Sequence, residues 1–350
     1  MNNKSIKDLV NPFVKSLKSY SSARDEFTAS DEDYLFLDAN ENPFPSDFNR
    51  YPDPHHVTLR EELARQKGIS ADQILLGNGS DEVIDLLIRT TCVPGQDEII
   101  SITPTYGMYQ VVADINQVEI NNIELTADFQ PDVDKMLSAV NKNTKLIFLC
   151  SPNNPTGNSL APAKILALLE NFEGLVVLDE AYVDFSIQPS MINLLDEHAN
   201  LVLMQTFSKA YGLAGLRLGM LIAHQELIQY VNKLKPPYNV NRFTQEKALK
   251  TIENMKPVKE KVDQIYKEKM MLEADLPRIN WIQKCYPSDA NFILVKVDYA
   301  QKRYQELLEH KIVVRDRSNL PLCENCIRIS IGTPDQNQRL MKVLQKMQER

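Results

Sequence analysis

The chain has 350 residues, 43% hydrophobic and 25% charged, a length suited to about two domains and a composition that argues against disorder. Its 39 Lys and Arg residues against 47 Asp and Glu residues give a net charge of −8, and without a long basic run nucleic acid is not an expected partner. No run of about 18 apolar residues is present, so we expect no membrane span.

The first predicted element is an amphipathic helix near the N-terminus. Apolar residues recur at helical spacing from Ile6 to Leu17, with lysines between them. We expect this helix to dock on the body of the protein or on a second subunit, an amphipathic targeting peptide being the alternative. A secretory signal would need a continuous apolar stretch and a small-residue cleavage site. The protein is therefore expected to be cytoplasmic.

From about residue 74 to residue 222, short apolar runs alternate with polar loops and segments of helical periodicity. Runs that are apolar on both faces are typical of strands buried between two layers of helices. The pattern predicts an α/β fold with a mostly parallel sheet, and the last run, which no helix precedes, could be antiparallel. The predicted strands are Ile74–Leu76, Glu98–Ile102, Leu146–Cys150, Leu175–Leu178, Leu201–Met204 and Leu218–Ala223.

The pattern changes after about residue 235. A long charged helical stretch runs to about residue 276, and two strand-like segments follow, Phe292–Val297 and Ile327–Ile331. We predict a large α/β domain over residues 45–235. A smaller α+β domain would comprise residues 236–350, together with an N-terminal arm of residues 1–44.

The five cysteines are scattered, which suits a reducing compartment where they act as small hydrophobic residues. Cys323 and Cys326 form a lone C-x-x-C pair. Zinc would require two further ligands that no second pair supplies, so no metal is expected.

Ligands of such sheets gather at the carboxyl ends of the strands, and the first predicted strand is followed there by GNGSDE, residues 77–82. Small residues at a strand-to-helix turn let backbone N–H groups face a phosphate. A plain capping turn, with Ser80 or Asp81 as the N-cap, is the alternative. As a dinucleotide fingerprint the motif is defective, because Glu82 stands where the third glycine belongs; a nucleotide dehydrogenase remains a competing interpretation.

Further candidate residues follow the next strands. Tyr106 could stack on a planar ligand or be a core residue, and Asn154 lies in a loop restricted by two prolines and a glycine. Asp179 ends an all-apolar strand and needs a cation beside it; the alternatives are a helix cap or a magnesium ligand, and the latter lacks a phosphate-binding loop. Lys209 lies among hydroxyls and small residues that can keep an amine nucleophilic, and an exposed lysine is its alternative.

In combination these residues predict a site for pyridoxal 5′-phosphate. A lysine that forms a Schiff base and an acid that pairs with the ring nitrogen are the recognisable features of such a site. The strings YPDP, GNGSDE, PTYGMY, SPNNPTG, VVLDEAY, TFSKAYGLAGLRLG and RISIGT resemble those of fold-type I aminotransferases, specifically the histidinol-phosphate aminotransferase family. The resemblance extends over almost the whole chain.

The resemblance implies a role for each candidate residue. Lys209 would carry the Schiff base, Asp179 would keep the ring nitrogen protonated, and Asn154 and Tyr182 would bind the ring's phenolic oxygen. Tyr106 would stack on the ring. The remaining cofactor-binding residues would be Gly79, Ser80, Asp81, Thr206, Ser208 and Arg217, with Tyr51 contributed by the neighbouring subunit of an obligate homodimer.

The resemblance also implies a ping-pong reaction in histidine biosynthesis, in which L-histidinol phosphate and 2-oxoglutarate give imidazole-acetol phosphate and L-glutamate. The substrate would be bound by Arg315, Arg328, Asn154 and, from the partner chain, Tyr20. Arginine forks suit a phosphate, although surface ion pairs are the alternative for Arg315 and Arg317.

Two other activities and one non-catalytic function remain open. Threonine-phosphate decarboxylation and transamination of aromatic amino acids would use the same lysine and acid, and a non-catalytic pyridoxal-phosphate-binding protein is the third. Aspartate-type relatives stack a tryptophan on the ring, whereas this chain has Tyr106 and its single tryptophan is Trp281. Cys323 and Cys326 have no role in the family that we can assign.

Overall fold

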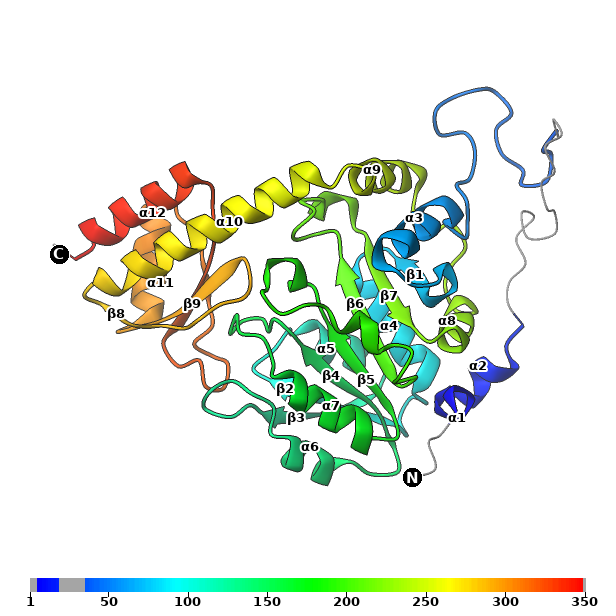
Figure 1. Ribbon diagram of the computed structural model, residues 1–350, viewed down its shortest axis with the longest axis horizontal. Coiled ribbons are helices and arrows are strands. Elements are labelled where there is room, and N and C mark those ends of the chain that lie inside the picture. The colour runs from blue at the N-terminus through cyan, green and yellow to red at the C-terminus, as the bar shows by residue number, and fades with distance from the viewer. Residues whose placement is uncertain (1–4, 19–34, 349–350) are drawn as a thin grey trace.

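The computed structural model describes residues 5–18 and 35–348. Its centre is a seven-stranded sheet in the order β1-β7-β6-β5-β4-β2-β3 (Figure 1). The strands are β1 (Ile74–Gly77), β2 (Glu98–Thr103), β3 (Glu119–Glu124), β4 (Thr144–Cys150), β5 (Leu175–Asp179), β6 (Leu201–Thr206) and β7 (Gly219–Ala223). The predicted α/β class and the six predicted strands are confirmed.

Strands β3, β2, β4, β5 and β6 are mutually parallel, and β7 runs antiparallel to both β6 and β1. The antiparallel option for the last run is thus the correct one. No α-helix separates β6 from β7; a loop with the short 3-10 helix η4 (Ala214–Leu216) returns the chain directly. This return brings the residues after β6 back to the edge of the sheet where β5 ends.

Helices cover both faces of the large sheet, which is why its strands are apolar on both sides. Neighbouring residues of one strand enter different cores: Ile74 and Leu76 belong to one cluster and Leu75 to the other. One face packs against α4 (Ser80–Thr91), α5 (Met108–Ile115) and α8 (Gln225–Asn232). The other packs against α3 (Val57–Lys67), α6 (Val133–Ala139), α7 (Pro162–Asn171) and α9 (Arg242–Ile252).

The edge strand β3 was not predicted from the sequence. Only Ile123 of this strand is buried, because β3 has a single neighbour and faces solvent over most of its length. Its sequence, EINNIE, therefore lacks the apolar run that identifies the central strands.

The predicted N-terminal helix is two short helices, α1 (Ile6–Leu9) and α2 (Pro12–Ser16). The break lies at Asn11, whose side chain accepts a hydrogen bond from the N–H of Phe13 and donates one to the carbonyl of Cys92. Four apolar side chains of this segment join the core beneath α4 and α8. The segment thus packs against the large unit of the same chain. The expected domain division, which groups residues 1–44 with the smaller unit, stays a prediction.

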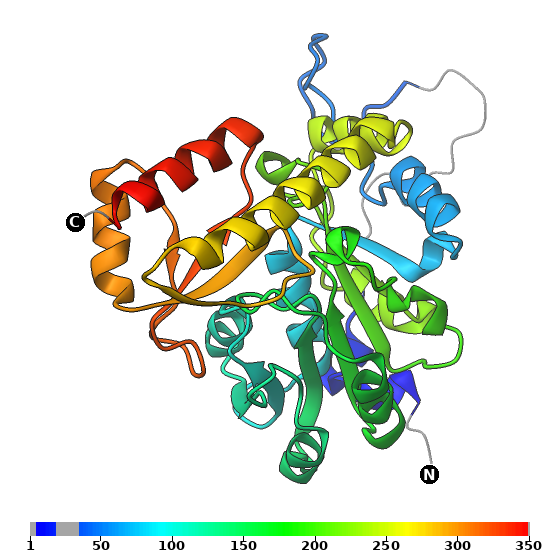
Figure 2. The same ribbon diagram turned by 60° about the vertical axis from the view of Figure 1, so that its left-hand side comes forward.

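The smaller unit is built on a four-stranded antiparallel sheet, in the order β10-β11-β9-β8. Its strands are β8 (Ile282–Cys285), β9 (Phe292–Val297), β10 (Arg315–Asp316) and β11 (Cys326–Ser330), and its helices are α10 (Lys256–Asp275), α11 (Ala300–Glu309) and α12 (Pro334–Lys346). Figure 2 shows these helices in yellow, orange and red, at the end of the molecule opposite to α1 and α2. The short strands β8 and β10 were not predicted, and the predicted long charged helix is interrupted between α9 and α10.

The two faces of the small sheet have different partners. Ile327 and Ile329 on β11 pack with α10, α11 and α12. Leu294 on β9, which pairs with Arg328, belongs instead to a core of the large sheet. The second face of the small sheet is therefore turned toward the large sheet. No helix in the described ranges is long and apolar enough to cross a membrane.

Candidate active site

A cavity of about 140 Å³ lies at the carboxyl ends of β4, β5 and β6, beside the N-terminus of α4. It brings together most of the cofactor-binding residues predicted from the sequence. Its lining consists of Ser80, Asp81, Tyr106, Cys150, Asn154, Asp179, Ala181, Tyr182, Thr206, Ser208, Lys209, Ala214 and Arg217.

The first turn of α4 approaches β7 so closely that glycine is required on both sides. A Cβ atom on Gly219 would lie 2.5 Å from the backbone nitrogen of Ser80. Gly79 is the N-cap and has a φ of +81°, and a Cβ there would lie 2.5 Å from Nη2 of Arg217. The alternative that Ser80 or Asp81 caps the helix is thus wrong. A helix N-terminus and a guanidinium at the same place are suited to binding an anion.

Glu82, the residue that spoils the dinucleotide fingerprint, has a local structural role. Its Oε2 accepts hydrogen bonds from the backbone N–H of Asn78, at 2.5 Å, and from Nδ2 of Asn239, at 2.7 Å. The carboxylate thereby fixes the loop before α4, and the competing nucleotide-binding interpretation loses its main support.

Asp81 holds two other lining residues in place. Its carboxylate accepts a hydrogen bond from the hydroxyl of Tyr106, at 3.0 Å, and lies 3.3 Å from Nη2 of Arg217. The ion pair is partly exposed, so its contribution to stability is small. Since the acid would repel a phosphate directly beside it, we interpret Asp81 as a residue that positions Tyr106 and Arg217.

Asp179 is buried at the end of β5, and among the residues that the structure describes it accepts hydrogen bonds only from uncharged groups. The hydroxyl of Tyr109 donates to Oδ2 at 2.6 Å, and the N–H of Ala181 donates to Oδ1 at 3.0 Å. Burial raises the pKa of Asp179 to about 6, although both hydrogen bonds favour the ionised form. A buried acid in this state is poised to receive a cationic partner.

Tyr109 was missed in the sequence analysis, which took only Tyr106 from the string PTYGMY. The ring of Tyr109 is fully buried, stacks on Phe148 with the ring centres 4.9 Å apart, and meets Tyr106 edge-on. Its position in the first turn of α5 was the available signal, since this turn follows β2 after the short loop of residues 104–107.

Lys209 follows β6 and projects into the same cavity. Burial, and next the positive charge of Arg328, lower the pKa of its amine, while Asp179 acts in the opposite direction. Its Nζ lies 5.5 Å from the centre of the Tyr182 ring. A lowered pKa increases the fraction of neutral amine, the form that acts as a nucleophile.

Arg328, a residue of the small sheet, contacts the cavity lining at Asn154 without belonging to the lining itself. Arg328 donates from Nη1 to Oδ1 of Asn154 at 2.5 Å, and its guanidinium lies over the ring of Phe292. Within the described residues, Nδ2 of Asn154 has no acceptor and Nε of Arg328 has no partner. Both groups keep the capacity to bind a ligand.

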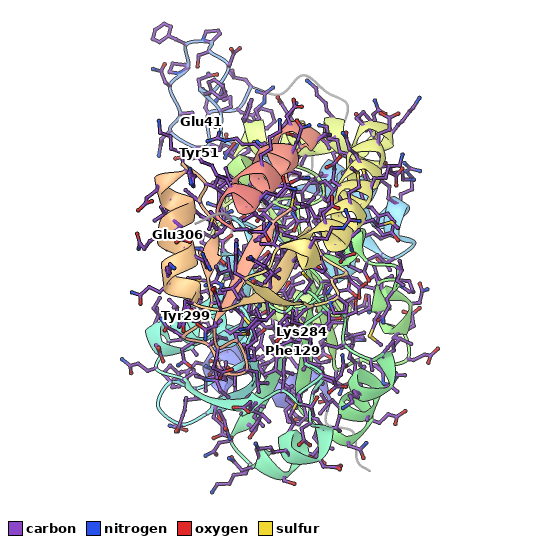
Figure 3. The ribbon with its side chains drawn as sticks, turned by 90° about the vertical axis from the view of Figure 1, so that its left-hand side faces the viewer. Glu41, Tyr51, Phe129, Lys284, Tyr299 and Glu306 are labelled. Carbon is purple, nitrogen blue, oxygen red and sulfur yellow. The ribbon has the colours of Figure 1, made fainter. Side chains whose placement is uncertain are left out.

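The remaining predicted residues lie outside the cavity lining. Arg315 is exposed on β10, opposite Arg328. Tyr51 is 52% exposed and stacks on Tyr238; Figure 3 shows it beside Glu41, well away from Lys284 and Phe129. Tyr20 falls in the range 19–34, outside the described residues.

Sequence comparisons identify the family. The model of the family "Aminotransferase class I and II" matches residues 39–344. A histidinol-phosphate aminotransferase of Flavobacterium johnsoniae is 53% identical, covering 98% of this chain and 99% of its own. A second, of Christiangramia forsetii, is 51% identical, covering 98% of each chain.

Solved structures show the same fold. The histidinol-phosphate aminotransferase of Clostridium acetobutylicum superposes with a TM-score of 0.80 at 23% identity, over 87% of this chain and 92% of that one. The histidinol-phosphate aminotransferase of Sinorhizobium meliloti, solved with pyridoxal-5′-phosphate, superposes with a TM-score of 0.78 at 24% identity, over 85% of this chain and 84% of that one. The L-threonine-O-3-phosphate decarboxylase of Porphyromonas gingivalis superposes with a TM-score of 0.73 at 25% identity, over 86% of this chain and 91% of that one. By its sequence and its fold, this chain belongs to the class I and II aminotransferases, in the family of the histidinol-phosphate aminotransferases.

Proposed function

We propose that this protein is a pyridoxal-phosphate-dependent transaminase that acts on L-histidinol phosphate, with 2-oxoglutarate as the amino acceptor. The observation that carries the proposal is that Lys209, Asp179 and the anion-binding N-terminus of α4 line one cavity. The relatives at about 50% identity over nearly the full chain support the choice of substrate.

The residues of the cavity fit the cofactor group by group. The N-terminus of α4, with Arg217, suits its phosphate. Asp179, buried and bonded only to neutral donors, suits a protonated ring nitrogen. The unpartnered Nδ2 of Asn154 suits the phenolic oxygen, with the nearby hydroxyl of Tyr182 as a second donor.

When bound, pyridoxal phosphate supplies an aldehyde that captures the substrate amine and a ring that accepts the electrons of the broken Cα–H bond. Lys209 would hold the cofactor and, as a free amine, would act as the general base that takes the proton from Cα of the substrate. Asp179 keeps the proton on the ring nitrogen. Asn154 and Tyr182 orient the ring by its oxygen, and Tyr106 covers one face of it.

Substrate binding in this proposal uses the small sheet. Arg328 and Arg315 face each other across β10 and β11 and would bind the phosphate of histidinol phosphate and a carboxylate of the second substrate. Tyr51 and Tyr20 would act on the neighbouring subunit's site in a homodimer. The exposure of Tyr51, away from the cavity of its own chain, supports that assignment. The cytoplasmic location stays a prediction.

An amine survey tests this function. The purified holoprotein is offered histidinol phosphate, threonine phosphate or an aromatic amino acid, each with 2-oxoglutarate. With histidinol phosphate we expect one glutamate to form for each molecule of amine consumed, and no CO₂ to be released. Release of CO₂ from threonine phosphate would indicate the decarboxylase, and glutamate formed only from aromatic amino acids would indicate the other transaminase. Cofactor binding without turnover of any amine would indicate a binding protein.

A further inference from the structure

Arg317, two residues beyond Arg315, is an arginine without an assigned role. The strand pairing fixes the direction of its side chain. Arg315 pairs with Arg328, and the backbone N–H of Arg317 donates to the carbonyl of Cys326. Residues two apart in a strand point to the same face, and so do directly opposed residues of paired strands. Arg315, Arg317 and Arg328 therefore lie on one face of the small sheet.

This face is the one turned toward the cavity. The alternate residues Val314, Ile327 and Ile329 enter the core under α10, α11 and α12, which leaves the arginine face for the large sheet. Arg328 on this face reaches Asn154. Arg317 thus lies on the side of the sheet from which the substrate is bound.

The surroundings of Arg317 are those of a binding residue and not of a surface ion pair. Its Nε is buried and has no partner within the described residues. The nearest acid along the strand, Asp316, accepts hydrogen bonds from the N–H and the hydroxyl of Ser318. No carboxylate of the described ranges forms an ion pair with Arg315, Arg317 or Arg328.

The electrostatics point the same way. Burial, and next the charge of Arg315, lower the pKa of Arg317. Burial is also the main cause that lowers the pKa of Arg328, and the charges of Arg317 and Arg315 lower it further. Tyr182, which lines the cavity, raises the pKa of both Arg317 and Arg328 and so partly opposes this lowering. Three mutually repelling guanidinium groups without a counterion destabilise the empty protein and favour an anion among them.

We propose that Arg317 is a specificity-determining residue that binds the substrate's phosphate together with Arg315 and Arg328. The proposal rests on the proposed function and adds a residue to it. A phosphate monoester is close to a dianion at neutral pH, whereas the carboxylate of glutamate is a monoanion. A third cation therefore favours the phosphorylated substrate over the amino acid that shares the site.

The test compares Arg317→Gln with Arg339→Gln, which removes a charge from an exposed position on α12 of the same unit. Because a hydrogen bond to a charged group is lost, we expect the KM for histidinol phosphate to rise about 10- to 100-fold in Arg317→Gln. The KM for glutamate is expected to change much less, and kcat and the cofactor absorbance to stay as in the wild type. Arg317→Lys is expected to restore part of the lost affinity for histidinol phosphate, because lysine keeps the positive charge but cannot form the two parallel hydrogen bonds of a guanidinium.

A second measurement does not depend on turnover. The holoenzyme is unfolded by heat with and without inorganic phosphate. Arg317→Gln is expected to be at least as stable as the wild type without phosphate, since a like charge is removed, and to be stabilised less by phosphate. A purely structural arginine would instead lower the stability without phosphate, and this result would overturn the proposal.

An equal rise of the KM for histidinol phosphate and glutamate, or an unchanged KM, would also overturn the proposal. Failure of the proposed function gives a different result. In that case the wild type does not turn over histidinol phosphate at all, and the phosphate-dependent stabilisation alone decides the role of Arg317.

Discussion

The hydroxyl of Tyr109 donates a hydrogen bond of 2.6 Å to Oδ2 of Asp179 from beneath the cavity floor. Tyr109 comes from the first turn of α5 and Asp179 from the end of β5, so the bond ties a helix to a neighbouring strand end. The N–H of Ala181 holds the other oxygen. The acid is thereby fixed in orientation before any cofactor binds, which is the preorganisation that efficient catalysis needs.

The first prediction concerns this bond. Tyr109→Phe removes a donor that favours the ionised form, so the pKa of Asp179 rises further and less of the acid is ionised at neutral pH. We expect a lower kcat, a shift of the acid limb of the pH profile to higher pH, and a loss of about 1–3 kcal/mol in stability. Tyr299→Phe, at an exposed tyrosine, is the control. An unchanged pH profile would contradict the role assigned to Tyr109.

The second prediction concerns Lys209. Lys209→Ala is expected to abolish transamination, because both the attachment point and the general base are lost. Borohydride treatment of the wild-type holoprotein, followed by peptide mapping, is expected to find the cofactor on the peptide that contains Lys209. Lys284→Ala, at an exposed lysine, is expected to keep the activity and the labelled peptide. A label on any other lysine would refute the assignment.

The third prediction concerns the pH dependence of the protein without its cofactor. The pKa of Asp179 is about 6 in the folded state and near 4 when unfolded. Between these values the unfolded chain releases its proton first, so stability falls as the pH rises from 4 to 6. Asp179→Asn is expected to remove this loss, which is at most about 3 kcal/mol. Urea unfolding of the cofactor-free protein and of the variant between about pH 4 and pH 6 measures this change in the free energy of unfolding.

The same variant separates stability from function. With the cofactor bound, the cationic ring nitrogen stabilises the ionised acid, so the wild type is expected to gain more stability from the cofactor than Asp179→Asn does. Asp179→Asn is also expected to lose most of its activity. An equal gain in both proteins would show that the acid does not meet the ring nitrogen.

The fourth prediction concerns the close approach of β7 and α4. In Gly219→Ala, the added carbon would meet the backbone of Ser80 and Gly79, which cannot yield as a flexible side chain could. We expect faster dissociation of the cofactor and a loss of about 1–3 kcal/mol in stability. Gly215→Ala is the matched control, because a Cβ there would have no heavy atom within 4 Å. Equal cofactor affinity in the two variants would argue against a phosphate site at α4.

The sequence was most informative where burial is complete. β4 and β5 are buried along their whole length apart from Lys145, so their apolar runs stand out and the residues that follow them identify the site. β3 is half solvated, and its polar sequence resembles a loop. The break between α1 and α2 was hidden because the apolar spacing continues across Asn11 and Pro12.

Tyr109 was missed, and Arg317 was considered only with a surface ion pair as its alternative, for a different reason. Tyr109 and Arg317 act from positions where tyrosine and arginine have ordinary structural uses, and spacing alone does not separate the two uses. Only the three-dimensional arrangement shows that the hydroxyl of Tyr109 meets Asp179, or that Arg317 shares a face with Arg328. Contacts between residues far apart in the sequence carry this information.

With the roles proposed above for Arg328 and Asn154, the contact between them would link the recognition of one end of a substrate to the electronics of the coenzyme. An anion that draws the guanidinium toward itself weakens its hold on the amide oxygen, and the amide then becomes a poorer donor at its other end. The coenzyme's colour and acidity would thus report whether the distant arginine is engaged. A molecule lacking the anionic end would leave the contact between Arg328 and Asn154 unchanged even while occupying the pocket.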